Sequence, residues 1–161
     1  MEVKQVQFSI EVYSSAAELA ADDAALLAEA KEVTKAAYAP YSNFFVGAAA
    51  KLANGIIFKG TNQENASYPV GICAERVLLS TVGALQPGAI IDTIAIAYNN
   101  TNGSSSNPVS PCGLCRQSLV EYETRVDHPI RLILSGMEGG VYIIPKASAL
   151  LPLSFTKNDM Q

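Results

Sequence analysis

Two short stretches, far apart in the chain, decide how it folds: Cys73-Ala74-Glu75-Arg76 and Pro111-Cys112-Gly113-Leu114-Cys115-Arg116-Gln117. Together they contain all 3 cysteines of the sequence. Catalytic zinc commonly has three protein ligands and one position left for water, whereas structural zinc commonly has four protein ligands. Zinc lowers the pKa of a bound water to about 7, and a neighbouring carboxylate can take its proton. The sequence therefore predicts a hydrolytic zinc site in which the cysteines bind the metal and Glu75 handles protons.

The spacing of the cysteines places them at the starts of two helices. Cys112 and Cys115 would face one way in the first turn of a helix over residues 112–125. Cys73 would take the matching position in a helix over residues 73–86. Both helix N-termini would then point at the metal, where free N–H groups and helix dipoles stabilise thiolates. A redox-active Cys-x-x-Cys beside an unrelated buried cysteine is the alternative interpretation, which the upstream Cys-Ala-Glu disfavours.

The first stretch is preceded by Asn62-Gln63-Glu64-Asn65-Ala66-Ser67-Tyr68-Pro69-Val70-Gly71-Ile72, and the whole segment is very similar to free-nucleoside cytidine deaminases. Zinc deaminases share a signature that allows three cysteine ligands and a glutamate that does not bind the metal. Residues 41–49 and 150–155 resemble the same family. The resemblance implies a three-layer α/β/α fold with a mixed five-stranded sheet and helices on both faces. It implies one domain over residues 1–161, in which residues 1–14 form an extra N-terminal strand or arm.

Hydrophobic periodicity outlines the first half of the fold. Apolar residues alternate with polar ones from Val6 to Val12, which predicts a half-buried strand at a sheet edge or a subunit contact. Ser15 and Glu18 match a capping box before a helix that ends ahead of Pro40. Asn54-Gly55 then predicts a hairpin between strands over residues 44–53 and 56–61.

Strands and helices alternate in the second half. Ile90 begins a buried strand, a polar loop runs from Asn99 to Ser110, and short strands follow at residues 130–135 and 141–144. Residues 146–151 predict a final helical turn. The alternation of strand and helix favours right-handed crossovers and a largely parallel sheet.

Composition disfavours several classes of partner. The net charge is −4 and no cluster of Lys and Arg occurs, which argues against a nucleic-acid polymer. The sequence has neither an apolar run of membrane-spanning length nor the apolar core of a signal peptide near Met1, so we expect no membrane attachment. An odd number of thiols indicates a reducing compartment, the cytoplasm. The mean hydropathy of +0.19 suggests apolar surface buried between subunits.

The family resemblance implies that Glu75 would carry a proton from water to N3 of cytosine, although its position in the sequence alone leaves open that it is a fourth metal ligand. The charge of the site suggests a role for Arg76 independently of the resemblance. Three thiolates make the site electron-rich, so Arg76 is a candidate to donate hydrogen bonds to the sulfurs and offset their negative charge; the alternative is a solvated helix residue. Arg116 is a second candidate for that role. The lone His128 is not assigned to the metal, because the cysteines fill the family's ligand positions.

The resemblance also implies how substrate would be bound. Asn62 and Glu64 match the pair that hydrogen-bonds the ribose 3′-hydroxyl, and such a buried polar pair rejects analogues without that group. Phe44 and Val46 would line the pocket, and Ala74 and Ser110 would recognise the base through their backbone groups. Phe155 resembles an aromatic that reaches into a neighbour's site in tetrameric members. Phe45 replaces a residue that is often proline in relatives, which would alter the pocket wall.

The leading hypothesis is a cytoplasmic homotetramer with one Zn²⁺ per chain, whose sites are completed by neighbouring subunits. It would deaminate cytidine and 2′-deoxycytidine to uridine and 2′-deoxyuridine in pyrimidine salvage, releasing ammonia. A related deaminase of another aminated heterocycle, such as an antibiotic nucleoside, is the alternative enzyme. A structural zinc module without catalysis is the alternative from another class, and it would be expected to lack Glu75 or to supply a fourth ligand.

Overall fold

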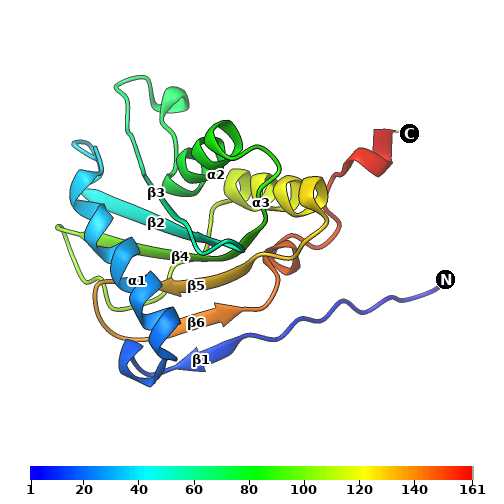
Figure 1. Ribbon diagram of the computed structural model, residues 1–161, viewed down its shortest axis with the longest axis horizontal. Helices are drawn as coiled ribbons and strands as arrows, with labels where there is room; N and C mark the ends of the chain where they lie inside the picture. The colour runs from blue at the N-terminus through cyan, green and yellow to red at the C-terminus, as the bar shows by residue number, and fades with distance from the viewer. Residues whose placement is uncertain (161) are drawn as a thin grey trace.

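The computed structural model describes residues 1–160, which form a layer of helices on each face of a six-stranded sheet of order β1-β6-β5-β4-β2-β3 (Figure 1). The strands are β1 (Glu11–Tyr13), β2 (Phe44–Leu52), β3 (Ile57–Thr61), β4 (Ile91–Asn100), β5 (Arg131–Ser135) and β6 (Val141–Ile144). The helices are α1 (Ala21–Val33) on one face and α2 (Ala74–Leu85) and α3 (Gly113–Val126) on the other. The predicted three-layer α/β/α fold is confirmed. The sheet has one strand more than predicted because β1 pairs with β6.

The sheet is mixed, and the expectation of a largely parallel sheet was wrong. Only β4 and β5 pair in parallel, whereas β2–β3, β2–β4, β5–β6 and β1–β6 are antiparallel. The reason lies in the strand order: β2 lies between β3 and β4, so the crossover through α2 joins strands that are not neighbours. The hairpin predicted at Asn54-Gly55 is confirmed, with Gly55 in the left-handed region at φ +84°.

Two apolar clusters hold the layers together. The larger packs α2 and α3 on the even-numbered residues of β2 and β4, and the smaller packs Leu26, Leu27 and Ala30 of α1 on the opposite face. Each face has one very close approach between helix and strand. A Cβ at Gly47 would lie 2.2 Å from the carbonyl oxygen of Ala30, and one at Gly60 would lie 2.6 Å from that of Ala74. Glycine is therefore required at both positions.

The N-terminal region differs from the prediction. The strand is confined to Glu11–Tyr13, and the preceding residues are exposed. The helix begins at Ala21 rather than just after Ser15, because a separate 3₁₀ turn, η1 (Ala16–Glu18), comes first. Ser15 makes no side-chain capping bond to η1; instead the Glu18 carboxylate accepts a hydrogen bond from the backbone N–H of Ser14 at 3.4 Å.

The polar loop after β4 is packed against the turn between β5 and β6. The Ser105 hydroxyl, in a buried residue, accepts a hydrogen bond from the backbone N–H of Asn100 at 2.8 Å. A Cβ at Gly136 would overlap the Ser105 carbonyl oxygen, so the two segments touch through backbone. The loop thereby delivers Ser110 and Cys112 to the start of α3. No helix within residues 1–160 is long and apolar enough to cross a membrane.

Candidate metal centre and active-site cavity

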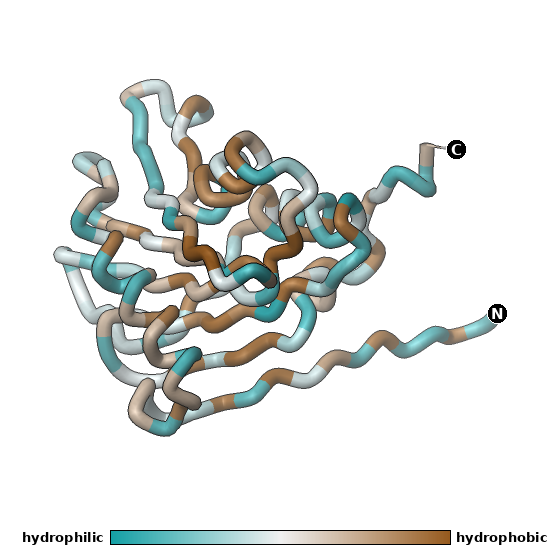
Figure 2. The backbone as a smooth tube through the Cα atoms, in the orientation of Figure 1, coloured by the Kyte–Doolittle hydropathy of each residue, from teal (hydrophilic) through white to brown (hydrophobic). Residues whose placement is uncertain are grey.

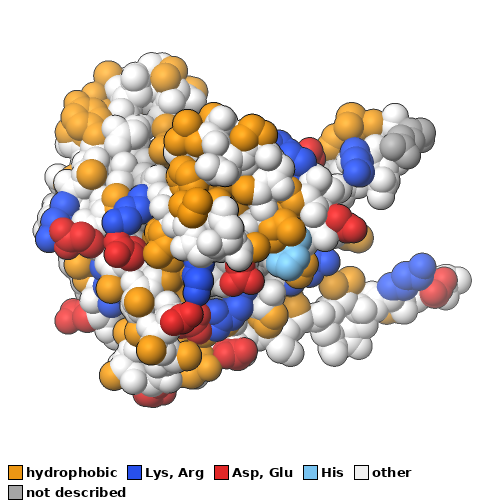
Figure 3. Space-filling model, in the orientation of Figure 1, with side chains coloured by type: hydrophobic (Ala, Val, Ile, Leu, Met, Phe, Trp, Pro, Cys, Tyr) orange, Lys and Arg blue, Asp and Glu red, His pale blue; other side chains and the backbone are white. Residues whose placement is uncertain are grey.

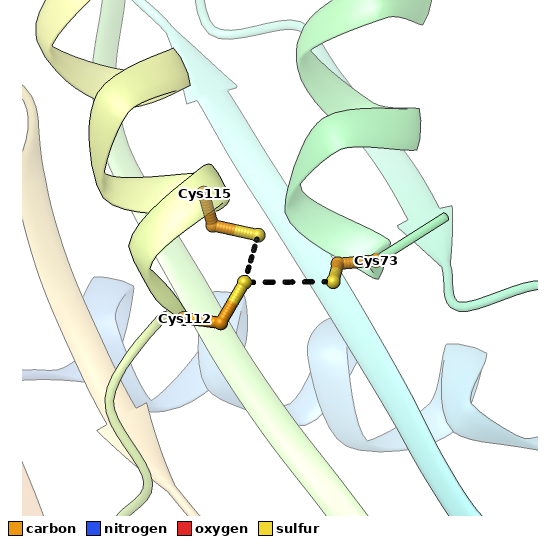
Figure 4. Close-up of side chains that lie close together, drawn as sticks. All are labelled: Cys73, Cys112 and Cys115. Carbon is orange, nitrogen blue, oxygen red and sulfur yellow. Dashed lines mark hydrogen bonds between the residues drawn. The ribbon is translucent and has the colours of Figure 1, made fainter. Parts of the chain in front are cut away.

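The three cysteines meet at the N-termini of α2 and α3, as predicted (Figure 4). Cys73 is the N-cap residue of α2, Cys112 is the N-cap residue of α3, and Cys115 lies in the first turn of α3. Both N-cap residues have extended backbone conformations, and neither side chain caps its own helix. Their sulfurs are therefore directed toward each other rather than toward helix N–H groups.

The sulfur geometry fits a tetrahedral zinc ion. Cys73 Sγ lies 3.8 Å from Cys112 Sγ, which lies 3.5 Å from Cys115 Sγ, and all three sulfurs are within 4.8 Å of one another. Sulfurs bound at about 2.3 Å to a tetrahedral Zn²⁺ are about 3.8 Å apart. The group contains the three thiols and no carboxylate among the residues described, so a tetrahedral ion would keep one position for another ligand.

The thiols influence one another's ionisation. A hydrogen bond with Cys115 stabilises the Cys73 thiolate and lowers the pKa of Cys73 to about 6, although burial acts in the opposite direction. The same interaction, together with burial, raises the pKa of Cys115. Cys73 is therefore the first of this pair to become a thiolate. A bound cation would favour the thiolate of Cys115 as well.

Glu75 is buried in the first turn of α2, two residues after Cys73, and is 5% exposed. Burial raises its pKa above the ordinary carboxyl value, because the charged form loses hydration. A carboxyl group of this kind can hold and release a proton closer to neutral pH than an exposed one can. Its position beside the cysteines, outside the ligand group, suits proton transfer.

A cavity of about 480 Å³ opens onto Cys73, Cys112 and Glu75. Most of the predicted substrate-binding residues line it, together with Cys73 and Cys112: Phe44, Val46, Asn62, Glu64 and Ser110. Ala74 is fully buried and Phe155 is 60% exposed, and neither contributes to the cavity wall. The structure thus brings together residues from β2, the segment after β3, the start of α2 and the loop before α3.

Asn62 is held in place by backbone groups of β2, and Glu64 by those of the segment just before it. Asn62 accepts a hydrogen bond from Val46 N–H at 2.7 Å and donates one to the Phe44 carbonyl at 2.9 Å. Glu64 Oε2 accepts hydrogen bonds from the backbone N–H groups of Tyr41 and Ser42 at 2.9 and 3.3 Å. One amide hydrogen of Asn62 and the second carboxylate oxygen of Glu64 are left for a ligand.

These hydrogen bonds also set the charge of Glu64. Partial burial is the largest single influence and would raise its pKa, but the combined hydrogen bonds from Ser42 and Tyr41 outweigh it and lower the pKa. Glu64 is consequently an acceptor at neutral pH, suited to a hydroxyl donor.

Phe44 has a supporting residue that the sequence did not reveal. The ring of Tyr98 stacks on that of Phe44, with centroids 4.6 Å apart and planes 12° from parallel. Tyr98 pairs with Val46 across β2 and β4, on the face of the sheet that carries α2 and α3, and is only 4% exposed. Tyr98 therefore backs the cavity wall formed by Phe44. No local signal identified it, since the stack depends on the register of two distant strands.

We expect Tyr98→Ala to lower the free energy of unfolding by about 3 to 5 kcal/mol, because it empties a buried aromatic site. It should also raise KM more than it lowers kcat, since Phe44 would lose its support. Tyr98→Phe keeps the ring and should behave like the wild type in both respects. Urea unfolding and steady-state kinetics would measure these effects; an unchanged KM for Tyr98→Ala would contradict the supporting role.

The two arginines after the cysteines have different surroundings. Arg76 makes no hydrogen bond to a sulfur among residues 1–160; it lines a separate groove between α2 and α3, and its charge contributes to lowering the pKa of Cys73. Arg116 donates hydrogen bonds to the carbonyls of Pro111 at 2.8 Å and Leu150 at 3.1 Å. Arg116 therefore fastens the metal-binding end of α3 to the loop before it and to the C-terminal region.

Known proteins are similar to this chain in sequence and in fold. The family model described as the cytidine and deoxycytidylate deaminase zinc-binding region matches residues 20–127. A cytidine deaminase of Halalkalibacterium halodurans is 38% identical over 135 residues, which are 84% of this chain and 95% of the relative. One of Mycobacterium tuberculosis is 38% identical over 109 residues, 66% of this chain and 77% of the relative.

Solved structures agree. The crystal structure of cytidine deaminase from Burkholderia pseudomallei superposes with a TM-score of 0.71 at 37% identity, covering 85% of this chain and all of that one. The shared fold, the matched zinc-binding region and the three clustered thiols lead to one assignment. The chain belongs to the zinc-dependent cytidine and deoxycytidylate deaminase family of hydrolytic enzymes.

Proposed function

We propose that this enzyme deaminates cytidine and 2′-deoxycytidine to uridine and 2′-deoxyuridine in pyrimidine salvage, with release of ammonia. The observation that carries the proposal is the single cavity that joins the three-thiol site, buried Glu75 and the Asn62–Glu64 pair. A structural zinc module would need neither a buried carboxyl group in that cavity nor a polar pair opposite it.

Cys73, Cys112 and Cys115 would hold one Zn²⁺ per chain. When bound, the ion supplies a Lewis acid and lowers the pKa of water. Glu75 accepts a proton from the attacking water and delivers it to N3 of the cytosine ring as the oxygen adds to C4. Glu75 then takes the remaining proton from the hydroxyl group on C4 and passes it to the exocyclic nitrogen, so the C4–N bond breaks, the C4 carbonyl forms and ammonia leaves. Water and cytidine thus give uridine and ammonia, and Glu75 ends in its original state.

The remaining residues would orient the nucleoside. Phe44 and Val46 pack against it, and the free groups of Asn62 and Glu64 bind the 3′-hydroxyl, which both ribose and 2′-deoxyribose carry. The backbone of Ala74 and Ser110 would recognise the base oxygen and the leaving amine. Arg76 would act on the thiolates through its charge, in keeping with its influence on the pKa of Cys73.

We further propose a homotetramer in which Phe155 of one chain completes a neighbour's site. Phe155 is away from the cavity of its own chain, while its carbonyl oxygen is held by Gln117 of α3 at 2.8 Å. The exposed ring is therefore presented outward. The clustered, unbridged thiols suit a reducing compartment, which supports a cytoplasmic location. A single domain over residues 1–161 stays part of the proposal.

A substrate panel with measured zinc content tests the proposed function. We expect one zinc per chain, ammonia release and a 280 nm absorbance change with cytidine and 2′-deoxycytidine. A preference for another aminated heterocycle would replace the proposed substrate. Zinc-loaded protein without deaminase activity would favour the structural module.

Glu64→Gln gives a sharper test of sugar recognition. Glutamine keeps the shape of the side chain but replaces the carboxylate, which would accept a hydrogen bond from the 3′-hydroxyl, by a neutral amide. The value of kcat/KM for cytidine should therefore fall by about 10- to 100-fold. The variant should discriminate less than the wild type against 3′-deoxycytidine, which lacks that hydroxyl. An equal loss with both substrates would show that Glu64 acts only through Tyr41 and Ser42.

A further inference from the structure

The first ten residues form an extended arm that leaves the body of the protein. All ten are exposed, and they continue the direction of β1 beyond the sheet (Figure 1). Residues 1–19 also lie outside the matched family region. Figure 3 shows it standing clear of the rest of the surface, with hydrophobic side chains along it.

The arm leaves the sheet because its partner strand ends. Glu11, Val12 and Tyr13 pair with Ile143, Tyr142 and Val141 of β6. The chain after Ile144 continues with Pro145, which has no N–H to donate, and then turns away so that Ala147 N–H bonds to the carbonyl of Ile130. Residues before Glu11 therefore have no strand to pair with in their own chain, among the residues described.

One side of the arm is an apolar stripe, which we define as Val6, Phe8, Ile10 and Val12. These side chains are 64, 51, 41 and 67% exposed. Hydrophobic and hydrophilic residues alternate along the backbone in Figure 2. Val12 pairs with Tyr142, which packs against the cluster under α2 and α3, so the stripe faces that side of the sheet. No helix of the described chain covers it.

We propose that the arms of two copies of this chain pair as antiparallel strands about a two-fold axis at Phe8. In this register, Phe8 lies opposite its counterpart and Val6 lies opposite Ile10, so apolar residues meet at the centre of one face, and Val12 lies opposite the alkyl chain of Lys4 at each end. On the other face Gln7 meets Ser9, and Gln5 meets Glu11. No like charges are opposed, and cross-strand apolar pairs of this kind stabilise a sheet.

The open edge explains why the partner is a second copy. Edge strands are usually blunted by proline, bulges or clustered charges, because a bare apolar edge recruits other strands. The arm has no proline and one lysine, Lys4, before β1. A two-fold contact uses the same edge on both chains, so it closes as a pair. The paired arms would be anchored at each end in a six-stranded sheet, which an isolated two-stranded ribbon lacks.

The two bodies do not compete for space in this arrangement. Residue 13 of one chain lies opposite residue 3 of the other. Residue 13 of the first chain and residue 13 of the second are therefore about 33 Å apart along the ribbon, at about 3.3 Å per residue. Residues 3–5 of each arm then lie along the free edge of the partner's β1, and β6 with the rest of that body lies on the other edge of β1. The contact is compatible with a dimer or with a tetramer made of two such pairs, and it requires none of the catalytic roles proposed above.

Cysteine cross-linking tests the register directly. Homotypic residues at the axis have Cα atoms about 4.5 to 5.5 Å apart, which a disulfide can bridge. Phe8→Cys should therefore form a covalent dimer on mild oxidation, and reductant should reverse it. Lys4→Cys is the control, because its counterpart would be about 26 Å away along the ribbon. The wild type measures any background from Cys112, which is exposed. Equal cross-linking of the two variants, or none by Phe8→Cys, would overturn the proposal.

Light scattering on a sizing column gives a second readout that does not need oxidation. Phe8→Asp should halve the mass of the wild-type assembly at the same protein concentration, because two charges would meet at the axis. Ser9→Asp places the same charge one residue away, on the polar face, and should retain the wild-type mass. Zinc content should stay the same in both variants, which shows that the body is folded and separates this test from that of the proposed function. An unchanged mass for Phe8→Asp would refute the pairing.

Discussion

Glu75→Gln is expected to lower the turnover of cytidine by about 10²- to 10⁴-fold while zinc stays bound. Glutamine has nearly the same shape as glutamate and can occupy the same buried position in the first turn of α2, but it cannot take a proton from water. The three sulfurs that bind the metal are untouched, so the metal content should equal that of the wild type. Single-turnover kinetics together with zinc analysis would separate the chemical step from metal loss.

The control for this experiment is Glu32→Gln, which makes the same change on the exposed surface of α1. It should retain wild-type turnover and zinc. If Glu75→Gln deaminates cytidine at the wild-type rate, Glu75 has no part in the reaction. If instead it loses zinc along with activity, Glu75 is a metal ligand, which is the role that the sequence left open.

Removal of the metal is expected to abolish activity and to destabilise the protein. A ligand that binds only the folded state adds about 2.7 kcal/mol when present at 100 times its Kd. For a chain of this size that corresponds to a rise in Tm of roughly 5 to 10 °C. Chelation should reverse the rise, and added zinc should restore both Tm and turnover.

Cys73→Ser should reproduce the effect of the chelator, and zinc should not rescue it. Ser80→Ala, on an exposed position of the same helix, is the matched control and should bind zinc normally. Because protons compete with the metal for the thiolates, zinc retention should decline as the pH falls. Full activity in the chelated protein would exclude a catalytic metal.

Local signals in the sequence predicted much of the fold and the metal centre. Asn54-Gly55 specifies its hairpin because this dipeptide readily adopts the positive φ angles of a tight turn, and the cysteines mark the helix starts where the structure places them. The thiols meet because the two crossover helices, α2 and α3, lie side by side on one face of the sheet. Three cysteines and their spacing were therefore enough to anticipate a site formed by distant parts of the chain.

Features that depend on distant neighbours were missed. Alternation from Val6 to Val12 predicts a strand, but the length of β1 is set by the end of β6 at Pro145, which the arm itself does not encode. The sequence prediction overestimated parallel pairing. An alternation of strands and helices does not reveal whether a third strand lies between the two strands that a crossover joins. Tyr98 is likewise visible only once the β2–β4 register brings its ring beneath Phe44.

The close approach at Gly60 limits how this enzyme can be redesigned. At Gly60 only a hydrogen atom separates β3 from the first turn of α2, which carries Glu75 and begins at Cys73. Even an alanine there would push that turn outward and displace the groups proposed to transfer protons and to bind zinc. Variants designed to accept bulkier bases should therefore leave the contact between β3 and α2 unchanged. The cavity should instead be enlarged through the loop that ends at Ser110 or through the stacked rings of Phe44 and Tyr98.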